Sequence, residues 1–161
     1  LTILLLGAPT LALGATFISN ETITTREETR DNLYVVGKTV GVGSPVNGDV
    51  VGAGAIVTVS EEILGDAFLI GETVTIGAPV LGDVRSAGRS ILILKSVDGD
   101  VVGAGATIQI SGGAVVKKDI FLISDSVTFS GNTLGNFSVN AREITIDGTV
   151  AEVTQTTVRI L

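Results

Sequence analysis

The sequence predicts an all-β fold: a single-stranded parallel β-helix, or solenoid, with about 17 residues per turn. Two observations support this prediction. Marker residues recur every 17 positions, and a fixed period of this length is typical of repeat architectures. The composition also fits, because 45% of the 161 residues are apolar, only 4% are aromatic and 21 are Gly. The core must therefore consist of Val, Ile, Leu and Ala, and β-branched side chains favour strands.

Acidic and glycine columns set the register of the repeat. Gly precedes most of the acidic residues, and a second Gly column follows them by five positions. We expect both columns at corners, where Gly adopts positive φ at little cost and Asp bonds its own backbone at the bend. The acidic column is Asn32, Asp49, Asp66, Asp83 and Asp100, and the second Gly column is Gly37, Gly54, Gly71, Gly88 and Gly105.

Apolar columns lie between these markers. Two of them are separated by two residues, which places both on one face of a strand. Others lie three residues before and one residue after each acidic position, as at Val80 and Val84 around Asp83. The residues that we expect in one continuous core are Val57, Val59, Val74, Ile76, Ile91, Ile93, Ile108 and Ile110.

The repeat continues to the end of the chain with two irregularities. It lengthens by two residues through Ser111–Ala114 and resumes at Asp119 and Asn136. In the final turn Val153, Val158 and Ile160 fit a 16-residue step better. The 17-residue repeat over residues 32–161 thus predicts about seven turns. At about 4.8 Å between adjacent strands, these turns would form a rod roughly 34 Å long. A sandwich of hairpins would not require a fixed register.

The N-terminal segment differs from the repeat. Residues 1–18 contain an uncharged apolar run that is typical of a signal peptide, or of a membrane anchor if apolar residues precede Leu1. Residues 19–31 are polar and charged, and we interpret them as a linker to the β-helix domain at 32–161. These features predict a location in the cell envelope, exported or membrane-anchored, with possible association with membrane or cell wall.

Composition argues against catalysis and nucleic-acid binding. The chain has a net charge of −7 and no visible cluster of Lys and Arg, which phosphate contacts require, and this argues against nucleic-acid binding. It also has no His and no Cys, so the commonest general base and the thiol nucleophile are absent. We expect no enzymatic activity, no cofactor and no metal. The acidic column could form a calcium ladder, but calcium sites normally concentrate several carboxylates in one loop, which favours a structural role at the bend. Gly52–Gly54 and Gly103–Gly105 lack the Lys and helix start of a phosphate loop.

Two other β-helix functions are less well supported. The segment Ile76–Val80 imitates a hexapeptide acyltransferase repeat, but that repeat would give an 18-residue turn and the catalytic His of those enzymes has no counterpart. A Thr and Ser array could bind ice or carbohydrate, but Ile56, Leu92, Gln109 and Glu143 interrupt it, and Thr is common on exposed strands. The array is Thr39, Thr73, Thr75, Ser90, Thr107, Ser126, Thr128 and Thr145.

Three segments resemble the bactofilin family of polymer-forming cytoskeletal proteins. They are Leu33–Val40, Val46–Gly54 and Val97–Gly105, and the likeness extends from about Asn32 to the C-terminus. The resemblance implies a right-handed, triangular β-helix that polymerises end to end without nucleotide. Typical members are cytoplasmic, and the apolar start of this chain departs from that pattern.

We therefore expect a structural, self-assembling protein, with a second copy of the chain as its partner. The apolar columns run to the C-terminus without a recognisable cap, and an uncapped solenoid exposes strand edges that accept another strand. The residues expected at this polymer interface are Ile144, Ile146, Val150, Val158 and Ile160. The alternative is a monomeric β-helix stalk or binding module that presents a lateral face to a glycan or protein partner.

Overall fold

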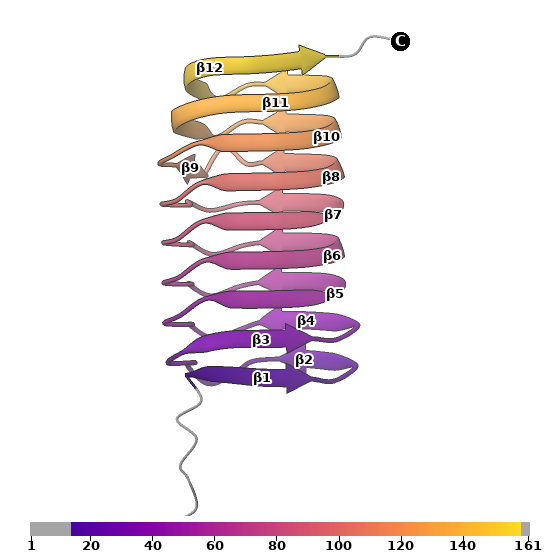
Figure 1. Cartoon of the computed structure of the whole chain (residues 1–161), viewed down its shortest axis with the longest axis vertical. Helices are drawn as coiled ribbons and strands as arrows, with labels where there is room; N and C mark the ends of the chain where they lie inside the picture. Colours follow the sequence, from indigo (N-terminus) through magenta and orange to yellow (C-terminus); the bar gives the residue numbers. More distant parts are fainter. Residues whose placement is uncertain (1–13, 159–161) are drawn as a thin grey trace, which may run out of the picture.

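A computed structural model describes residues 14–158, which form one continuous parallel β-solenoid of about eight turns. In Figure 1 the chain runs left to right along the near side, returns along the far side and rises with each turn, which makes the solenoid right-handed. The predicted all-β class and 17-residue turn are confirmed. The strands are β1 (Ala15–Ser19), β2 (Thr22–Thr24), β3 (Asn32–Val36), β4 (Thr39–Val42), β5 (Val50–Val59), β6 (Ala67–Ile76), β7 (Val84–Ile93), β8 (Val101–Ile110), β9 (Val115–Val116), β10 (Ile120–Phe129), β11 (Asn132–Ile146) and β12 (Thr149–Val158).

Each coil has three sides. The long strands bend at the second Gly column, so that in β6 the residues 67–70 form one side and the residues 73–76 form the next. We call these sides A and B, and we apply the same letters to the equivalent residues of every coil. The third side is short and is held by single parallel bridges, such as Ile63 to Val80 and Val80 to Val97.

The core is a set of stacked aliphatic columns. All eight residues predicted for it, from Val57 to Ile110, are buried and belong to one cluster. The inward column of the third side is also shielded from solvent, because Val46, Ile63 and Val80 are fully buried. Every strand pairing among the described residues is parallel. From β5 to β8 the pairing is also in register, so side chains of the same column stack on one another from coil to coil.

One core position is polar and unsatisfied. Ser86 lies in an inward column of side A between Leu69 and Gly103, and its buried hydroxyl has no hydrogen-bond partner. An unmade hydrogen bond costs free energy because the hydroxyl has left water. We expect Ser86→Ala to raise the free energy of unfolding by about 1 kcal/mol in chemical denaturation.

A matched serine provides the control for this prediction. Ser44 is also buried, but its hydroxyl donates to the Glu27 carbonyl at 2.7 Å, and its Oγ lies within hydrogen-bond distance of Thr25 Oγ1 at 3.0 Å. Ser44→Ala should therefore lower the free energy of unfolding by about 1 kcal/mol. Equal effects of the two substitutions would contradict the assignment of Ser86 as unsatisfied.

The glycine columns have a different cause from the one expected from sequence. No described Gly has a positive φ, so the expectation of left-handed corners is wrong. Coil stacking brings backbone too close for a side chain instead. A Cβ on Gly71 would lie 2.8 Å from the carbonyl oxygen of Gly54, and one on Gly82 would lie 2.6 Å from that of Gly65. Gly is required here by close approach between coils.

The solenoid begins one coil earlier than expected. β1 pairs with β3 from Ala15↔Asn32 onwards, and β2 pairs with β4. The segment 19–31, interpreted as a polar linker, therefore belongs to the first coil, and the expected boundary at residue 32 is wrong. Its inward positions are filled by Ile23, Thr25 and Thr29, which are all buried. The polar residues between them face outwards, as the alternation of a strand allows.

Most of the expected signal-like or anchor segment lies outside the described residues. Of residues 1–18, the structure describes only the last few, and those from Ala15 onwards form β1. Within residues 14–158, no helix is long and apolar enough to cross a membrane.

The first predicted irregularity occurs, and the second occurs in part. The two extra residues form a turn in which the Ala114 N–H donates to the Ser111 carbonyl at 2.9 Å, and the columns then resume. In the last turn Phe137 pairs with Val153, which confirms the 16-residue step at this point. A bulge restores the 17-residue step, so Val158 pairs with Ala141 and the expected 16-residue alignment of Val158 is wrong.

Candidate functional site

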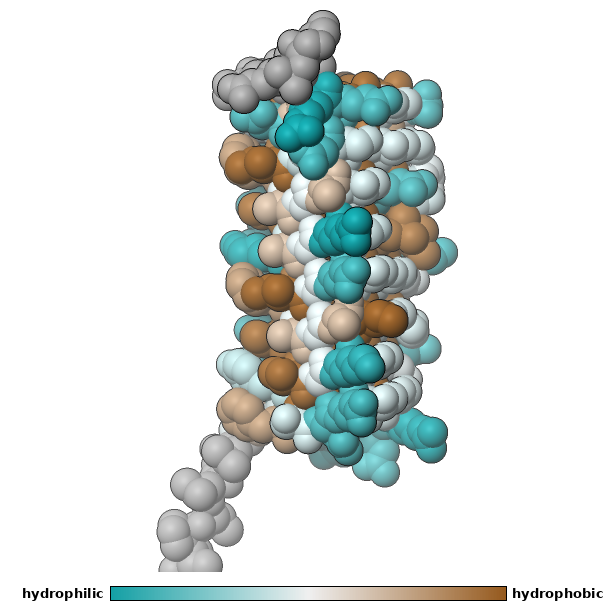
Figure 2. Space-filling model, turned by 90° about the vertical axis from the view of Figure 1, so that its right-hand side faces the viewer, coloured by the Kyte–Doolittle hydropathy of each residue, from teal (hydrophilic) through white to brown (hydrophobic). Residues whose placement is uncertain are grey.

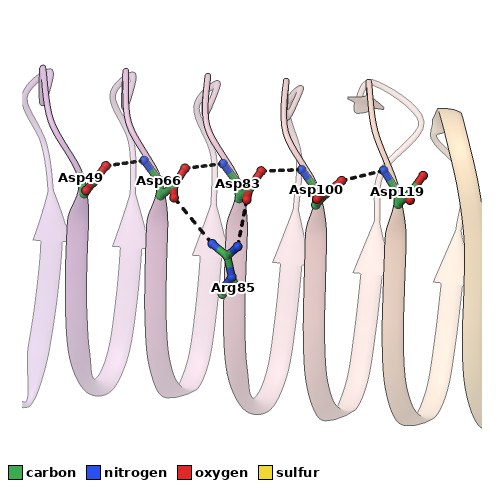
Figure 3. A network of polar contacts seen from close by, with 6 residues as sticks. All are labelled: Asp49, Asp66, Asp83, Arg85, Asp100 and Asp119. Carbon is green, nitrogen blue, oxygen red and sulfur yellow. Dashed lines mark hydrogen bonds and ion pairs between the residues drawn. The ribbon is translucent and has the colours of Figure 1, made fainter.

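The acidic column forms a hydrogen-bonded ladder along one corner of the solenoid (Figure 3). In each step the side-chain Oδ1 of one coil accepts the backbone N–H of the equivalent residue in the next coil, at 2.8–3.0 Å. We call this set the Asx ladder. The expectation that each Asp bonds its own bend is wrong, because the side chains join neighbouring coils. The members are Asn32, Asp49, Asp66, Asp83, Asp100, Asp119 and Asn136.

The Asx ladder has a structural explanation that requires no metal ion. Its Oδ1 atoms already accept backbone N–H groups, and the part of the chain that the structure describes contains no group of three or more His, Cys, Asp or Glu placed to hold a metal ion. Arg85 lies beside the ladder, with Nη2 at 2.9 Å from Asp83 Oδ2 and Nη1 at 3.6 Å from Asp66 Oδ2. At this corner, hydrogen bonds from the Asx ladder therefore link successive coils, and Arg85 neutralises part of the negative charge of the ladder.

Asp83 in the Asx ladder has a lowered pKa in the folded protein. The N–H of Asp100 holds this pKa below the ordinary value, Arg85 lowers it further, and desolvation opposes both. The folded pKa is thus lower than the unfolded one. The resulting stabilisation is present above the unfolded pKa and is lost as the pH falls through the folded pKa.

Asn should replace Asp83 with little loss of stability at neutral pH, because the amide oxygen can still accept the Asp100 N–H. Asn32 already does so for Asp49 at 2.8 Å. We expect Asp83→Asn to cost less than about 1 kcal/mol at pH 7, since the Arg85 side chain of the ion pair is about half exposed and that of Asp83 is partly exposed. Below about pH 4 the variant should lose less stability than the parent.

Asp83→Ala is the contrasting variant, because it removes the acceptor and should lower the free energy of unfolding by about 1–2 kcal/mol. Denaturation at pH 7 and pH 3 measures both substitutions. Equal effects of Asn and Ala at pH 7 would show that the bond to Asp100 does not stabilise the fold.

Three of the five residues expected at the polymer interface lie at the C-terminal end of the described core. Ile144 and Ile146 extend the columns of Val127 and Phe129. Ile144 is half-buried and Ile146 is 42% exposed, whereas Val127 and Phe129 are fully buried. The pairing of β11 with β12 stops at Ala141, so within residues 14–158 no strand pairs with Ile144 or Ile146 from the C-terminal side.

The other expected interface residues are only partly placed. Val150 is half-buried against the core and pairs with Thr133. Val158 ends β12, but its side chain and the whole of Ile160 lie outside what the structure describes. At the opposite end, β1 and β2 each pair with one strand only among the described residues. Both ends of the described solenoid therefore present strand edges beside apolar columns.

Side A carries an exposed apolar surface that was not predicted. Two outward columns there are almost entirely apolar. Figure 2 shows a band of hydrophobic residues along the left of the molecule, with hydrophilic and then mainly intermediate residues to its right. The signal in the sequence was the run Leu33–Val36, in which every residue is apolar although only alternate ones point inwards. We call the following residues the side-A stripe: Phe17, Tyr34, Val51, Phe68, Val102 and Phe121 in one column, and Val36, Ala53, Ile70, Ala87, Ala104 and Ile123 in the other.

Comparison of the chain with protein-family models, with curated proteins and with solved structures found no match.

Proposed function

We propose that this protein is a structural, self-assembling β-solenoid whose copies stack end to end, in the manner that the resemblance to bactofilins implies. The observation that supports this proposal most directly is that, within residues 14–158, no strand pairs with Ile144 or Ile146 on the C-terminal side of the core columns. Apolar side chains and strand edges left open in this way favour the addition of another strand.

The regular coil supports a head-to-tail arrangement. Ile23 occupies in the first coil the column that Ile144 occupies at the C-terminal end, because each described step between them pairs in register. A second copy could thus continue the same column in the same direction. Strands of adjacent copies would then lie about 4.8 Å apart, as they do within one copy.

A charge at the open end tests this proposal. We expect Ile146→Lys to shorten or abolish filaments, because a Lys at the junction must lose its hydration when a second copy binds. Ile56→Lys is the matched control, since Ile56 is 48% exposed but lies outwards on side B. Light scattering and electron microscopy of the purified proteins measure assembly, and circular dichroism checks that the β structure is retained.

Two outcomes would contradict the proposal. Filaments of Ile146→Lys as long and abundant as those of the parent would show that this end is not the junction. A parent protein that stays monomeric at high concentration would favour the alternative function, a stalk that binds a glycan or protein partner.

We further propose that assembly takes place in the cell envelope. This proposal rests on the apolar run of residues 1–15 and on the polar residues that follow it. Fractionation of cells that express the full-length gene product tests it. A pool confined to the cytoplasm, with the N-terminal residues retained, would contradict it.

A further inference from the structure

The side-A stripe is large for a surface that faces water. Its register is continuous over seven coils, from Phe17 to Phe121 in one column. Phe68 and Ile70 are each 46% exposed, and Phe121 and Ile123 are about half exposed. Isolated apolar residues are common on protein surfaces, but contiguous patches of this size mark interaction sites.

One charged residue interrupts the side-A stripe, and its charge is directed away from it. Arg85 occupies the position between Phe68 and Val102. Its guanidinium group bonds to Asp83 and Asp66 at the corner, as Figure 3 shows. The aliphatic part of Arg85 therefore remains in the column, while its charged end is paired at the edge of side A.

The side-A stripe also has relief. Phe68 and Ile70 form one ridge, and Phe121 and Ile123 form a second. Between them lies a shallow, mainly apolar hollow at Ala87 and Ala104, where the stripe has small side chains. A surface with ridges and hollows of similar width can interdigitate with a second surface of the same kind.

We propose that the side-A stripe packs against the side-A stripe of a second copy of this chain. Seven of its bulky members are between 39% and 68% exposed, so covering the stripe would remove roughly 600 Å² from water on each copy. Two such faces reach the lower limit of about 1,200 Å² for a stable interface. A two-fold axis uses the same patch on both copies, which a self-complementary face permits. The result is a lateral pair, in addition to any stacking through the ends.

Cross-linking tests this lateral pair separately from end-to-end assembly. The chain has no Cys, so Ala87→Cys introduces a single thiol close to the middle of the side-A stripe. A two-fold axis that covers the whole stripe must pass near this position. Packed sheets lie about 10 Å apart, whereas equivalent residues of end-stacked copies would be about 38 Å apart over eight coils. A short bismaleimide should therefore link Ala87→Cys chains into covalent dimers only if the stripes face each other.

Three variants control this experiment. Thr75→Cys places the thiol on side B and should give no more than background cross-linking. In the Ala87→Cys chain, Ile70→Lys should reduce the yield of dimer at least tenfold, whereas Ile56→Lys, with nearly the same exposure on side B, should leave it unchanged. Circular dichroism checks the fold of each variant.

The inference is overturned if the Ala87→Cys chain gives no dimer above the Thr75→Cys background, which is also the result expected if another partner covers the side-A stripe. It is equally overturned if Ile70→Lys and Ile56→Lys have the same effect. Neither result depends on whether filaments form, so failure of lateral pairing is distinguishable from failure of end-to-end stacking.

Discussion

Gly82→Ala should destabilise the solenoid by about 3 kcal/mol, because the added methyl group has no space between two coils. The new Cβ would meet Oδ1 of Asp66 and lie 2.6 Å from both the carbonyl carbon and the oxygen of Gly65. Most of these atoms are backbone, so they cannot rotate away as the end of a side chain can. Relief requires the coils to separate, which weakens the adjacent bond from Asp83 to Asp66.

The matched control is Gly113→Ala, in the two-residue insertion. There the nearest atom to a new Cβ is the Leu94 carbonyl oxygen at 3.6 Å, an ordinary contact. This substitution should be neutral or slightly stabilising, since Ala restricts the unfolded chain more than Gly does. Urea denaturation followed by circular dichroism compares the two, and equal stability of both variants would contradict the close-approach explanation.

Phe129→Ala should have an effect of similar or larger size, about 3–5 kcal/mol. Phe129 is fully buried, and its ring lies 5.0 Å from that of Phe137 in a tilted arrangement. Removing the ring leaves a cavity beneath Ile146, at the end of its column. The narrow core offers few ways to fill this space, because β10, which carries Phe129, is held by parallel pairing with β8 on one side and with β11 on the other.

Phe121 provides the comparison within the same strand. It lies in β10 eight residues before Phe129, but it points outwards and is 48% exposed. Phe121→Ala should change the free energy of unfolding by less than about 1 kcal/mol, while it should weaken lateral pairing if the stripes face each other. A loss of stability in Phe121→Ala as large as that in Phe129→Ala would contradict this division between core and surface.

The core could be predicted because the same pattern of apolar residues recurs in every coil, and each repeat adds support for the register. A single pair such as Val74 and Ile76 is compatible with many folds, but its repetition at 17-residue intervals leaves little choice of register. The insertion after Ile110 was also visible, since the same columns resume beyond it. Periodicity therefore predicted which residues face inwards throughout the regular region.

Contacts between coils were harder to predict. The sequence places Gly82 beside Asp83, which is typical of a turn, but it does not show that the carboxylate of Asp66 reaches the N–H of Asp83. The first coil was missed for a related reason: Ala15 and Asn20 stand where the Asx and Gly markers would be. Ile23 was the remaining signal, 17 residues before Val40.

The turn at Ser111–Ala114 shows where this protein can accept changes in chain length. Two additional residues are accommodated there while Asp119 still donates to Asp100 and Val116 still bridges to Val97. Extra residues at this corner cost only the conformational entropy of closing a slightly longer exposed loop, and this cost rises slowly with the number of residues in the loop. An epitope or fluorophore-binding peptide inserted between Gly112 and Gly113, both exposed, would therefore report on the rod in cells without disturbing its stacking.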